Sequence, residues 1–223
     1  MRFLDRAAAG QELAQALRDL KGRDDLLVLG IPRGGVVVAC EVARALGAPL
    51  DVCLTHKLGA PDNPELAIGA VAETGQVVLD QGLIDSLWVP PAYIEAESKR
   101  QRQELARRAH AYRGDRPPPQ ILKRTAIVVD DGLATGSTMI AALQALDAQA
   151  PASLIAAIPV APPEAIRRLA HHADRIECLI SPRPFWAVGA FYDRFEQVSD
   201  DTVIELLRMA ASRVAPLKRE IDQ

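Results

Sequence analysis

Short apolar runs alternate along the chain with stretches whose apolar residues recur at helical spacing. The runs at 26–31, 126–129, 151–160 and 175–180 have the length and continuity of strands that are buried on both faces. The first three are each followed by a segment of helical periodicity. This alternation predicts an α/β fold, a doubly wound and mainly parallel sheet with helices on both faces.

Other segments add to this set of expected elements. Helical spacing at 7–20 and at 202–213 predicts one helix near each end of the chain, and residues 50–55 have the character of a further strand. The segment 66–79 contains two short apolar runs on either side of a glycine turn, which indicates an antiparallel pair.

The segment 90–112 has the length of a long helix but few apolar residues. Its basic residues outnumber its glutamates, and the two signs are interleaved. This pattern is typical of a solvated helix laid over a neighbouring element or a subunit partner. Its aromatic residues are not on the basic face, so a nucleic-acid-binding helix is the less favoured interpretation.

Composition is that of a soluble globular protein, with 49% hydrophobic and 25% charged residues. A net charge of −3 offers no electrostatic footprint for nucleic acid. Cys40, Cys53 and Cys178 lie far apart in apolar surroundings, which favours buried free thiols in a reducing cytosol, and their spacing fits no zinc site. The first residues lack a signal-peptide core, and no run has the length of a membrane span. We therefore expect a cytoplasmic protein.

The loop at 132–138 combines small and hydroxyl residues between the predicted strand at 126–129 and a predicted helix. Its small side chains leave the backbone accessible, and the free N–H groups and dipole of a helix N-terminus favour a phosphate. Thr135, Ser137 and Thr138 add hydroxyl donors. The loop therefore predicts an anion site.

Two adjacent acids, Asp130 and Asp131, separate the strand from this loop. Carboxylates repel a phosphate, but they accept hydrogen bonds from sugar hydroxyls or hold a metal that bridges to them. The strand end and the loop together predict a ligand with both a phosphate and a diol, such as a ribose 5-phosphate. An ordinary capped turn would explain one of these residues but not the whole string.

Arg33 and the glycines Gly34 and Gly35 follow the predicted strand at 26–31. Two glycines let the backbone approach a ligand closely and expose N–H groups, and the arginine offers a fixed fork to phosphate oxygens. Taken alone, the stretch is also compatible with a βα turn that carries a solvated arginine. Beside the anion loop, the ligand-binding interpretation is favoured.

The string at 128–138, VVDDGLATGST, resembles the signature of the type I phosphoribosyltransferases. That family uses 5-phosphoribosyl 1-pyrophosphate (PRPP) as its donor. The resemblance implies that Asp130 and Asp131 bind the ribose hydroxyls and that Arg33, with the amides of Gly34 and Gly35, binds the pyrophosphate. The 5′-phosphate would be bound by the loop residues Ala134, Thr135, Gly136, Ser137 and Thr138.

The resemblance also implies parts that cover the site. In the family a mobile loop closes over the reacting centre, and the turn residues at 59–64 suit such a lid, within a lid hairpin and helical insertion that together span 58–119. Lys57 lies where the family often has a basic residue near the pyrophosphate, although a solvated strand end explains it equally well.

Five aromatic residues gather within eleven positions, between Phe185 and Phe195. Stacking on a planar ring would suit them, and so would a hydrophobic plug or a contact in a homodimer. The stretch 181–200 resembles the hood of purine-salvage members of the family. By that resemblance Trp186 stacks on the base, and Asp193 meets a metal-bound pyrophosphate.

The expected activity is an Mg²⁺-dependent transfer of ribose 5-phosphate from PRPP to a nitrogenous base, with release of pyrophosphate, as in nucleotide salvage. Hypoxanthine/guanine-type members carry an Asp where this chain has Ala134, so the resemblance names no base. A non-catalytic PRPP- or nucleotide-binding regulatory domain is an alternative, and a phosphosugar or nucleotide hydrolase is a weaker one. We expect one domain over 1–213 and a frayed tail over 214–223.

Overall fold

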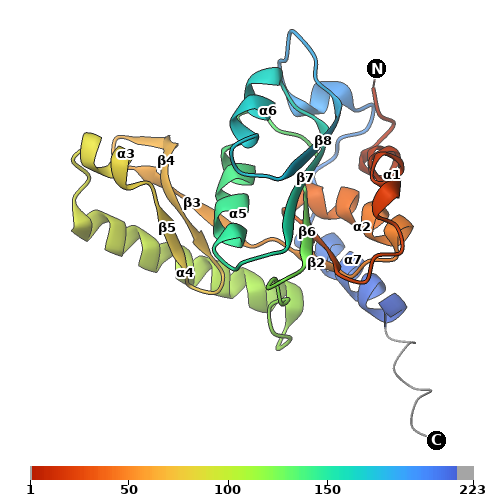
Figure 1. The fold of residues 1–223 in the computed structure, drawn as a ribbon, viewed down its shortest axis with the longest axis horizontal. Helices are drawn as coiled ribbons and strands as arrows, with labels where there is room; N and C mark the ends of the chain where they lie inside the picture. The colour runs from red at the N-terminus through yellow and green to blue at the C-terminus, as the bar shows by residue number, and fades with distance from the viewer. Residues whose placement is uncertain (1, 215–223) are drawn as a thin grey trace, which may run out of the picture.

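A five-stranded parallel sheet forms the centre of the computed structural model, which describes residues 2–214 (Figure 1). Its strand order is β2-β1-β6-β7-β8, and all four pairings are parallel. The strands are β1 (Leu26–Gly30), β2 (Leu50–Val52), β6 (Thr125–Val129), β7 (Ser153–Val160) and β8 (Arg175–Ile180). The parallel α/β fold that the sequence predicts is thus confirmed, whereas most of the expected tail, 215–223, lies outside the described residues.

Helices cover both faces of this sheet because alternate strand residues enter two different cores. In β1, Leu26 and Val28 pack toward α1 (Arg6–Ala16) and α2 (Gly34–Leu46). Leu27 and Leu29 point to the opposite face. That face is covered by α5 (Ser137–Asp147) and α6 (Pro163–Leu169). Burial on both faces explains the continuous apolar runs of the strands.

The direction of winding reverses between β1 and β6. From β1 the chain passes through α2 to β2 on one side, and from β6 it passes through α5 to β7 on the other. The chain therefore leaves β1 and β6 toward opposite faces of the sheet, at the carboxyl ends of two adjacent strands. In open α/β sheets this switch point is where ligands bind.

A second, antiparallel sheet of order β3-β4-β5 lies beside α5 (Figure 1). Its strands are β3 (Thr55–Ala60), β4 (Asn63–Ala72) and β5 (Val77–Leu79). The single strand expected over 50–55 is wrong, because the chain changes sheets at Cys53 and Leu54. The Cys53 N–H still donates to the Gly30 carbonyl, whereas the Leu54 carbonyl accepts from the Glu73 N–H of the hairpin.

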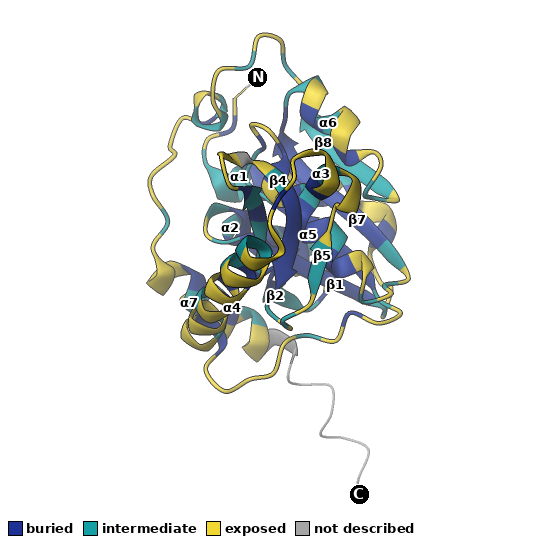
Figure 2. Ribbon diagram, turned by 90° about the vertical axis from the view of Figure 1, so that its left-hand side faces the viewer, coloured by how far each residue is buried: buried dark blue, intermediate teal, exposed yellow. Residues whose placement is uncertain are grey.

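Three helices share an apolar core with this hairpin. They are α3 (Gln81–Ser86), α4 (Pro91–Arg113) and α7 (Asp200–Val214). Apolar residues of all three meet β3 and β4 in a third core, and Figure 2 shows that the outer side of α4 is exposed along its length. The solvated helix predicted over 90–112 is confirmed, whereas α3 was not foreseen. Among the described helices none is both long and apolar enough to span a bilayer.

A buried arginine fastens the end of α4 to both sheets. The Arg113 side chain is only 2% exposed. Its guanidinium pairs with Asp51 of β2 and with Glu73 beyond β4, and it also donates to the Val52 carbonyl. The helical insertion is therefore tied to the main sheet by a charged cluster as well as by apolar packing.

Candidate functional site

The loops after β1 and β6 touch each other through two glycines. A Cβ placed on Gly34 would lie 1.9 Å from Oδ2 of Asp131, and one on Gly35 would lie 2.7 Å from the Val129 carbonyl oxygen. Neither contact leaves room for a side chain, so glycine at 34 and 35 is what allows the loops to meet. The structure thus brings Gly34, Gly35 and the acid pair together, as the sequence predicts.

Asp130 occupies unfavourable surroundings for a negative charge. Its side chain is half-buried, and the charge of Asp131 is adjacent. Burial, reinforced by the Asp131 charge, raises the pKa of Asp130 well above its usual range. Its Oδ1 accepts a hydrogen bond of 2.8 Å from the Asp131 N–H. The remaining lone pairs can accept hydrogen bonds from the hydroxyls of a bound sugar.

Asp131 is paired with an arginine that the sequence reasoning missed. Arg6 Nε donates to Asp131 Oδ2 at 2.7 Å, and both side chains are largely buried. The same guanidinium donates to the Glu196 carbonyl and lies 3.8 Å from the centre of the Phe195 ring. Arg6 therefore links α1, the acid pair and the segment after β8. No local sequence pattern connects Arg6 to a residue 125 positions further on.

Tyr192 and Val188 pack the segment after β8 against the acid loop. The Tyr192 hydroxyl donates to the Asp131 carbonyl oxygen at 2.5 Å, and its ring is buried. A Cβ on Gly132 would lie 2.4 Å from Cγ1 of Val188. Burial raises the pKa of Tyr192, so it remains a neutral hydrogen-bond donor at physiological pH. The loop backbone at 131–132 is thus held by this contact.

The anion loop leads directly into α5. Gly136 is the N-cap in a left-handed conformation (φ 78°) and has no side chain to cap the helix, while Thr135 Oγ1 accepts a long hydrogen bond of 3.4 Å from the Ser137 N–H. The hydroxyls of Thr135 and Ser137 lie 3.0 Å apart, and Arg168 of α6 donates to the Thr135 carbonyl at 3.0 Å. The N–H groups of this first turn, beside three hydroxyls, can bind an anion. Arg168 is a second residue that local patterns do not reveal.

Arg33 is the N-cap of α2, and the Pro32–Arg33 peptide bond is cis. Its side chain is 41% exposed and its Nη1 lies 4.0 Å from Oδ1 of Asp200, at the start of α7. Arg33 thus presents a partly exposed guanidinium near the start of α7, where it can meet a phosphate group.

Three other predicted residues lie further from the acid pair. Lys57 is on β3, in the second sheet, opposite Ala70. Asp193 is exposed and pairs with Arg2 at 3.2 Å. Trp186 is 84% exposed. The structure does not bring Lys57, Asp193 or Trp186 into direct contact with the residues of the two central loops.

The aromatic cluster is mostly a plug. Phe185 stacks on Phe191 with ring centroids 5.5 Å apart, and Tyr192 stacks on Phe195 at 4.9 Å. Both pairs pack within the segment 185–195, which fits the alternative of a hydrophobic plug. Trp186 differs from them, because its ring projects from the segment and is free to stack on a planar ligand.

The segment 59–64 is a hairpin turn rather than an irregular loop. Ala60 pairs with Asn63, and Gly59 sits at a β-bulge against Pro64. The Tyr93 hydroxyl of α4 donates to the Gly59 carbonyl at 3.0 Å. The tight turn follows from the Pro, Asp and Asn chemistry noted in the sequence, and α4 holds the strand that leads into it.

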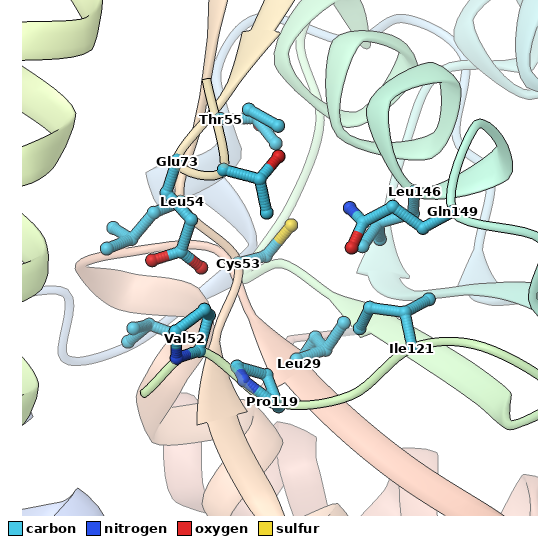
Figure 3. A pocket seen from close by; sticks show the side chains of 13 residues that line it. Leu29, Val52, Cys53, Leu54, Thr55, Glu73, Pro119, Ile121, Leu146 and Gln149 are labelled. Carbon is cyan, nitrogen blue, oxygen red and sulfur yellow. The ribbon is translucent and has the colours of Figure 1, made fainter. Parts of the chain in front are cut away.

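A small cavity lies where the chain passes from β2 to β3 (Figure 3). Cys53, Ile121 and Leu146 are among its lining residues, and its volume is about 20 Å³, enough for one water molecule. Burial raises the pKa of the Cys53 thiol to about 12. A protonated thiol in so small a space fits a packing role. Cys40 is buried and Cys178 is half-buried, and neither forms a disulfide in the described part of the chain.

Residues 2–214 hold no cluster of three or more His, Cys, Asp or Glu side chains that could bind a metal by themselves. The carboxylates available to a metal at the two central loops are instead one adjacent pair, Asp130 and Asp131. Such a pair suits Mg²⁺ that keeps waters and ligand phosphate oxygens in its coordination sphere.

These features define an α/β protein with a loop of small and hydroxyl residues and an acid pair at the switch point of its sheet. The chain belongs to the phosphoribosyl transferase family, because the family model described as "Phosphoribosyl transferase domain" matches residues 3–194. This confirms the family that the string at 128–138 predicts.

Individual relatives agree with that assignment. The chain is 44% identical over 208 residues to a protein of Mycobacterium tuberculosis (strain ATCC 25618 / H37Rv) named "Putative phosphoribosyl transferase Rv0571c". The match covers 93% of this chain but 47% of the relative, so the chain spans about half the length of the curated relatives it matches. It is also similar to the crystal structure of TT1426 from Thermus thermophilus, with 47% identity, a TM-score of 0.86, and coverage of 93% of this chain and 98% of that one.

Proposed function

We propose that this chain transfers ribose 5-phosphate from PRPP to a nitrogenous base and releases pyrophosphate. Family membership gives the reaction class. The observation that carries the proposal is the contact between the two loops, in which Gly34 lies directly against the Asp131 carboxylate. A donor with a pyrophosphate on the ribose carbon next to its diol needs a pyrophosphate-binding loop and a diol-binding acid pair side by side.

Each part of the donor then has a partner. The 5′-phosphate binds the N–H groups and hydroxyls of 134–138, and Asp130 and Asp131 accept hydrogen bonds from the ribose hydroxyls. Arg33 and the amides of Gly34 and Gly35 bind the pyrophosphate. Arg6 offsets the charge of Asp131 and fixes the direction of its carboxylate.

The reaction is a displacement at the anomeric carbon. A ring nitrogen of the base forms a bond to C1 while the bond from C1 to the pyrophosphate oxygen breaks, and that electron pair leaves with pyrophosphate. The nitrogen then gives up its proton. Because positive charge develops on the ribose, the nearby acid pair stabilises the transition state and the arginine stabilises the leaving group.

We also propose that the donor binds with Mg²⁺. The metal, when bound, neutralises charge on the pyrophosphate oxygens. Asp130 and Asp131 would reach such a metal through the ribose hydroxyls that they bind. Asp193 would have to break its ion pair with Arg2 to contact the metal. The chain itself supplies the orientation of the donor and the exclusion of water by the covering segments.

The acceptor is proposed only as a planar nitrogenous base. Trp186 offers an exposed ring for stacking. Ala134, which is also exposed, provides no carboxylate for a base nitrogen. A base that loses its proton without help from residue 134 is therefore the expected acceptor.

The test is incubation with Mg-PRPP and a panel of bases, scored by pyrophosphate release. We expect base-dependent release by the wild-type chain and none by Asp130→Asn combined with Asp131→Asn. Measurable PRPP binding without release for any base would overturn the transferase and leave a binding domain.

A further inference from the structure

A hollow lined by three arginines shares Arg33 with the proposed donor site. Its volume is about 370 Å³, and it lies between the loop after β1, the last turns of α4 and the start of α7. Its lining residues are Pro32, Arg33, Arg107, Arg108, Tyr112 and Asp200. We call it the arginine hollow. The helical insertion thus contributes charge beside a residue of the donor site.

The two arginines of α4 keep free donors despite their acidic neighbour. Glu104 accepts from Nε and Nη2 of Arg107, at 2.9 Å each, and from Nε of Arg108 at 2.8 Å. One carboxylate is therefore shared between two guanidinium groups. Within residues 2–214 no side chain accepts from the terminal nitrogens of Arg108, which remain available to an anion.

Asp200 is the acid that opposes an anion in the hollow. It accepts a 2.6 Å hydrogen bond from the Tyr112 hydroxyl and lies 4.0 Å from Arg33. Its carboxylate thus faces the Arg33 guanidinium across the hollow. The hollow has three guanidinium groups, and the carboxylates near them are Asp200 and the Glu104 that pairs with Arg107 and Arg108. The positive charges therefore outnumber the negative ones.

The end of α4 is fixed well enough to present these arginines. The buried Arg113 is the last residue of α4, and the Tyr112 before it is also buried. The backbone of Arg107 and Arg108 is therefore held relative to the carboxyl end of β2, next to the loop that carries Arg33. Arg107 and Arg108 thus combine a fixed backbone with long side chains that can adjust to an anion.

We propose that the arginine hollow binds the pyrophosphoryl group, with Arg107 and Arg108 of α4 as additional ligands beside Arg33. The proposal rests on the proposed function for the identity of the ligand, since Arg33 connects the hollow to the donor site. It assigns the long helical insertion a direct part in holding the pyrophosphate of the donor and of the product.

The test measures the affinity of the full chain for inorganic pyrophosphate by titration calorimetry, with and without Mg²⁺. For Arg107→Gln combined with Arg108→Gln we expect at least a tenfold weaker affinity, and a similar rise in KM for PRPP wherever turnover is detected. Both side chains are exposed, at 66% and 48%, so the variant should fold normally.

Arg100→Gln is the matched control. Arg100 lies on the same helix, has the same pairing with a glutamate three residues before it, and lines a neighbouring hollow without Arg33. Its affinity for pyrophosphate should stay within twofold of the wild type. An equal loss in the control would mean general electrostatic attraction and would overturn the proposal, as would unchanged affinity in the double variant or no binding by the wild type.

Failure of the proposed function has a different signature. If pyrophosphate binds, the double variant weakens it and no base supports turnover, the hollow is a pyrophosphate site on a chain that is not a transferase. If turnover is found and the double variant leaves both KM and pyrophosphate affinity unchanged, the transferase stands and the arginine hollow is not part of it.

Discussion

Replacing Asp130 is expected to stabilise the fold while weakening the binding of the donor. Its folded-state pKa is raised above the unfolded value of about 3.9. The neutral form therefore suits the fold, and stability is lost as pH rises from about 4 toward the folded pKa. Asp130→Asn should raise the Tm at pH 7 by about 2–4 °C, which corresponds to about 1 kcal/mol in a domain of this size.

Thermal unfolding at several pH values checks this expectation. The gain in Tm should shrink as the pH is lowered toward 4, and PRPP binding should be weakened at every pH. Asp62→Asn, in the exposed turn after β3, is the control and should show no pH-dependent gain. A Tm for Asp130→Asn below that of the wild type at pH 7 would contradict the account.

Gly34 makes the loop contact possible, so a single methyl group should disable the site. The new Cβ would lie 1.9 Å from Asp131 Oδ2 and 2.8 Å from Arg6 Nε. Displacing either group separates the pyrophosphate loop from the acid pair. We expect Gly34→Ala to weaken PRPP binding at least tenfold and to cost about 1–3 kcal/mol of stability through overpacking, as measured by calorimetry and chemical denaturation.

Gly82→Ala serves as the control for that substitution. Its Cβ would meet nothing nearer than 3.6 Å, and it lies within α3, where alanine is the better helix former. Its PRPP affinity should equal that of the wild type. Equal affinity in Gly34→Ala would show that the loop contact is not needed for binding.

At the residue scale, the sequence revealed the groups that lie next to each other along the chain. The acid pair, the anion loop and the glycines of the first loop have the predicted places. Arg6 and Arg168 were missed because each meets its partner only through the packing of distant elements. Long-range ion pairs carry no local pattern in a single sequence.

At the scale of the elements, the attachment of α4 to the two sheets involves the buried ion pairs of Arg113. Arg113→Met removes the partner of Asp51 and of Glu73, whose side chains are only 16% and 14% exposed. Two buried carboxylates would remain uncompensated, so we expect a loss of about 3 kcal/mol in the free energy of unfolding. Chemical denaturation measures this loss.

Arg100→Met provides the comparison on the same helix. Arg100 is 71% exposed, and its partner Glu97, which is 16% exposed, would keep a 2.7 Å hydrogen bond from Gln101, so the loss of Arg100 should cost little. Its unfolding midpoint should match the wild type. If Arg113→Met were as stable as Arg100→Met, the charged cluster would not be what anchors the insertion.

At the element scale, periodicity predicted most helices and strands, with boundary differences. It failed at 50–55, where two short strands of different sheets are joined without a turn signal, because Cys53 and Leu54 are as apolar as the strands. It also missed α3, whose six residues are too short for periodicity to register, although Asp80 is a proper N-cap. Short elements are set by tertiary packing.

On the scale of the whole molecule, the site depends on segments from almost every part of the chain. The first loop, α1 and the segment after β8 all contact the acid loop at Asp131 and Gly132. A ligand that contacts several of them should stabilise the folded chain as a unit. At a hundred times its Kd, PRPP should add about 2.7 kcal/mol, a rise in Tm of about 5–10 °C.

Fragments of the donor test whether the site has two halves. Pyrophosphate and ribose 5-phosphate should each raise the Tm less than PRPP at equal concentration, because each reaches only one of the two loops. A shift with pyrophosphate alone as large as that with PRPP would show that the acid pair and the loop at 134–138 take no part.

The topology of the whole molecule decides which features were predictable. The βα alternation predicted the parallel sheet, and the motifs after two of its strands predicted the parts of the site, whereas the strand order and its switch point come from the structure. The way the loop after β1, α4 and α7 line the arginine hollow was not predictable, because it depends on packing between elements far apart in the chain.

Titration of Mg-PRPP into the wild-type chain and into the combined Asp130→Asn and Asp131→Asn variant tests the central claim most directly. The account predicts saturable binding by the wild type and an affinity at least tenfold weaker in the variant, with both proteins folded. No binding by the wild type, or equal binding by the two proteins, would contradict the assignment of the donor site to this acid pair.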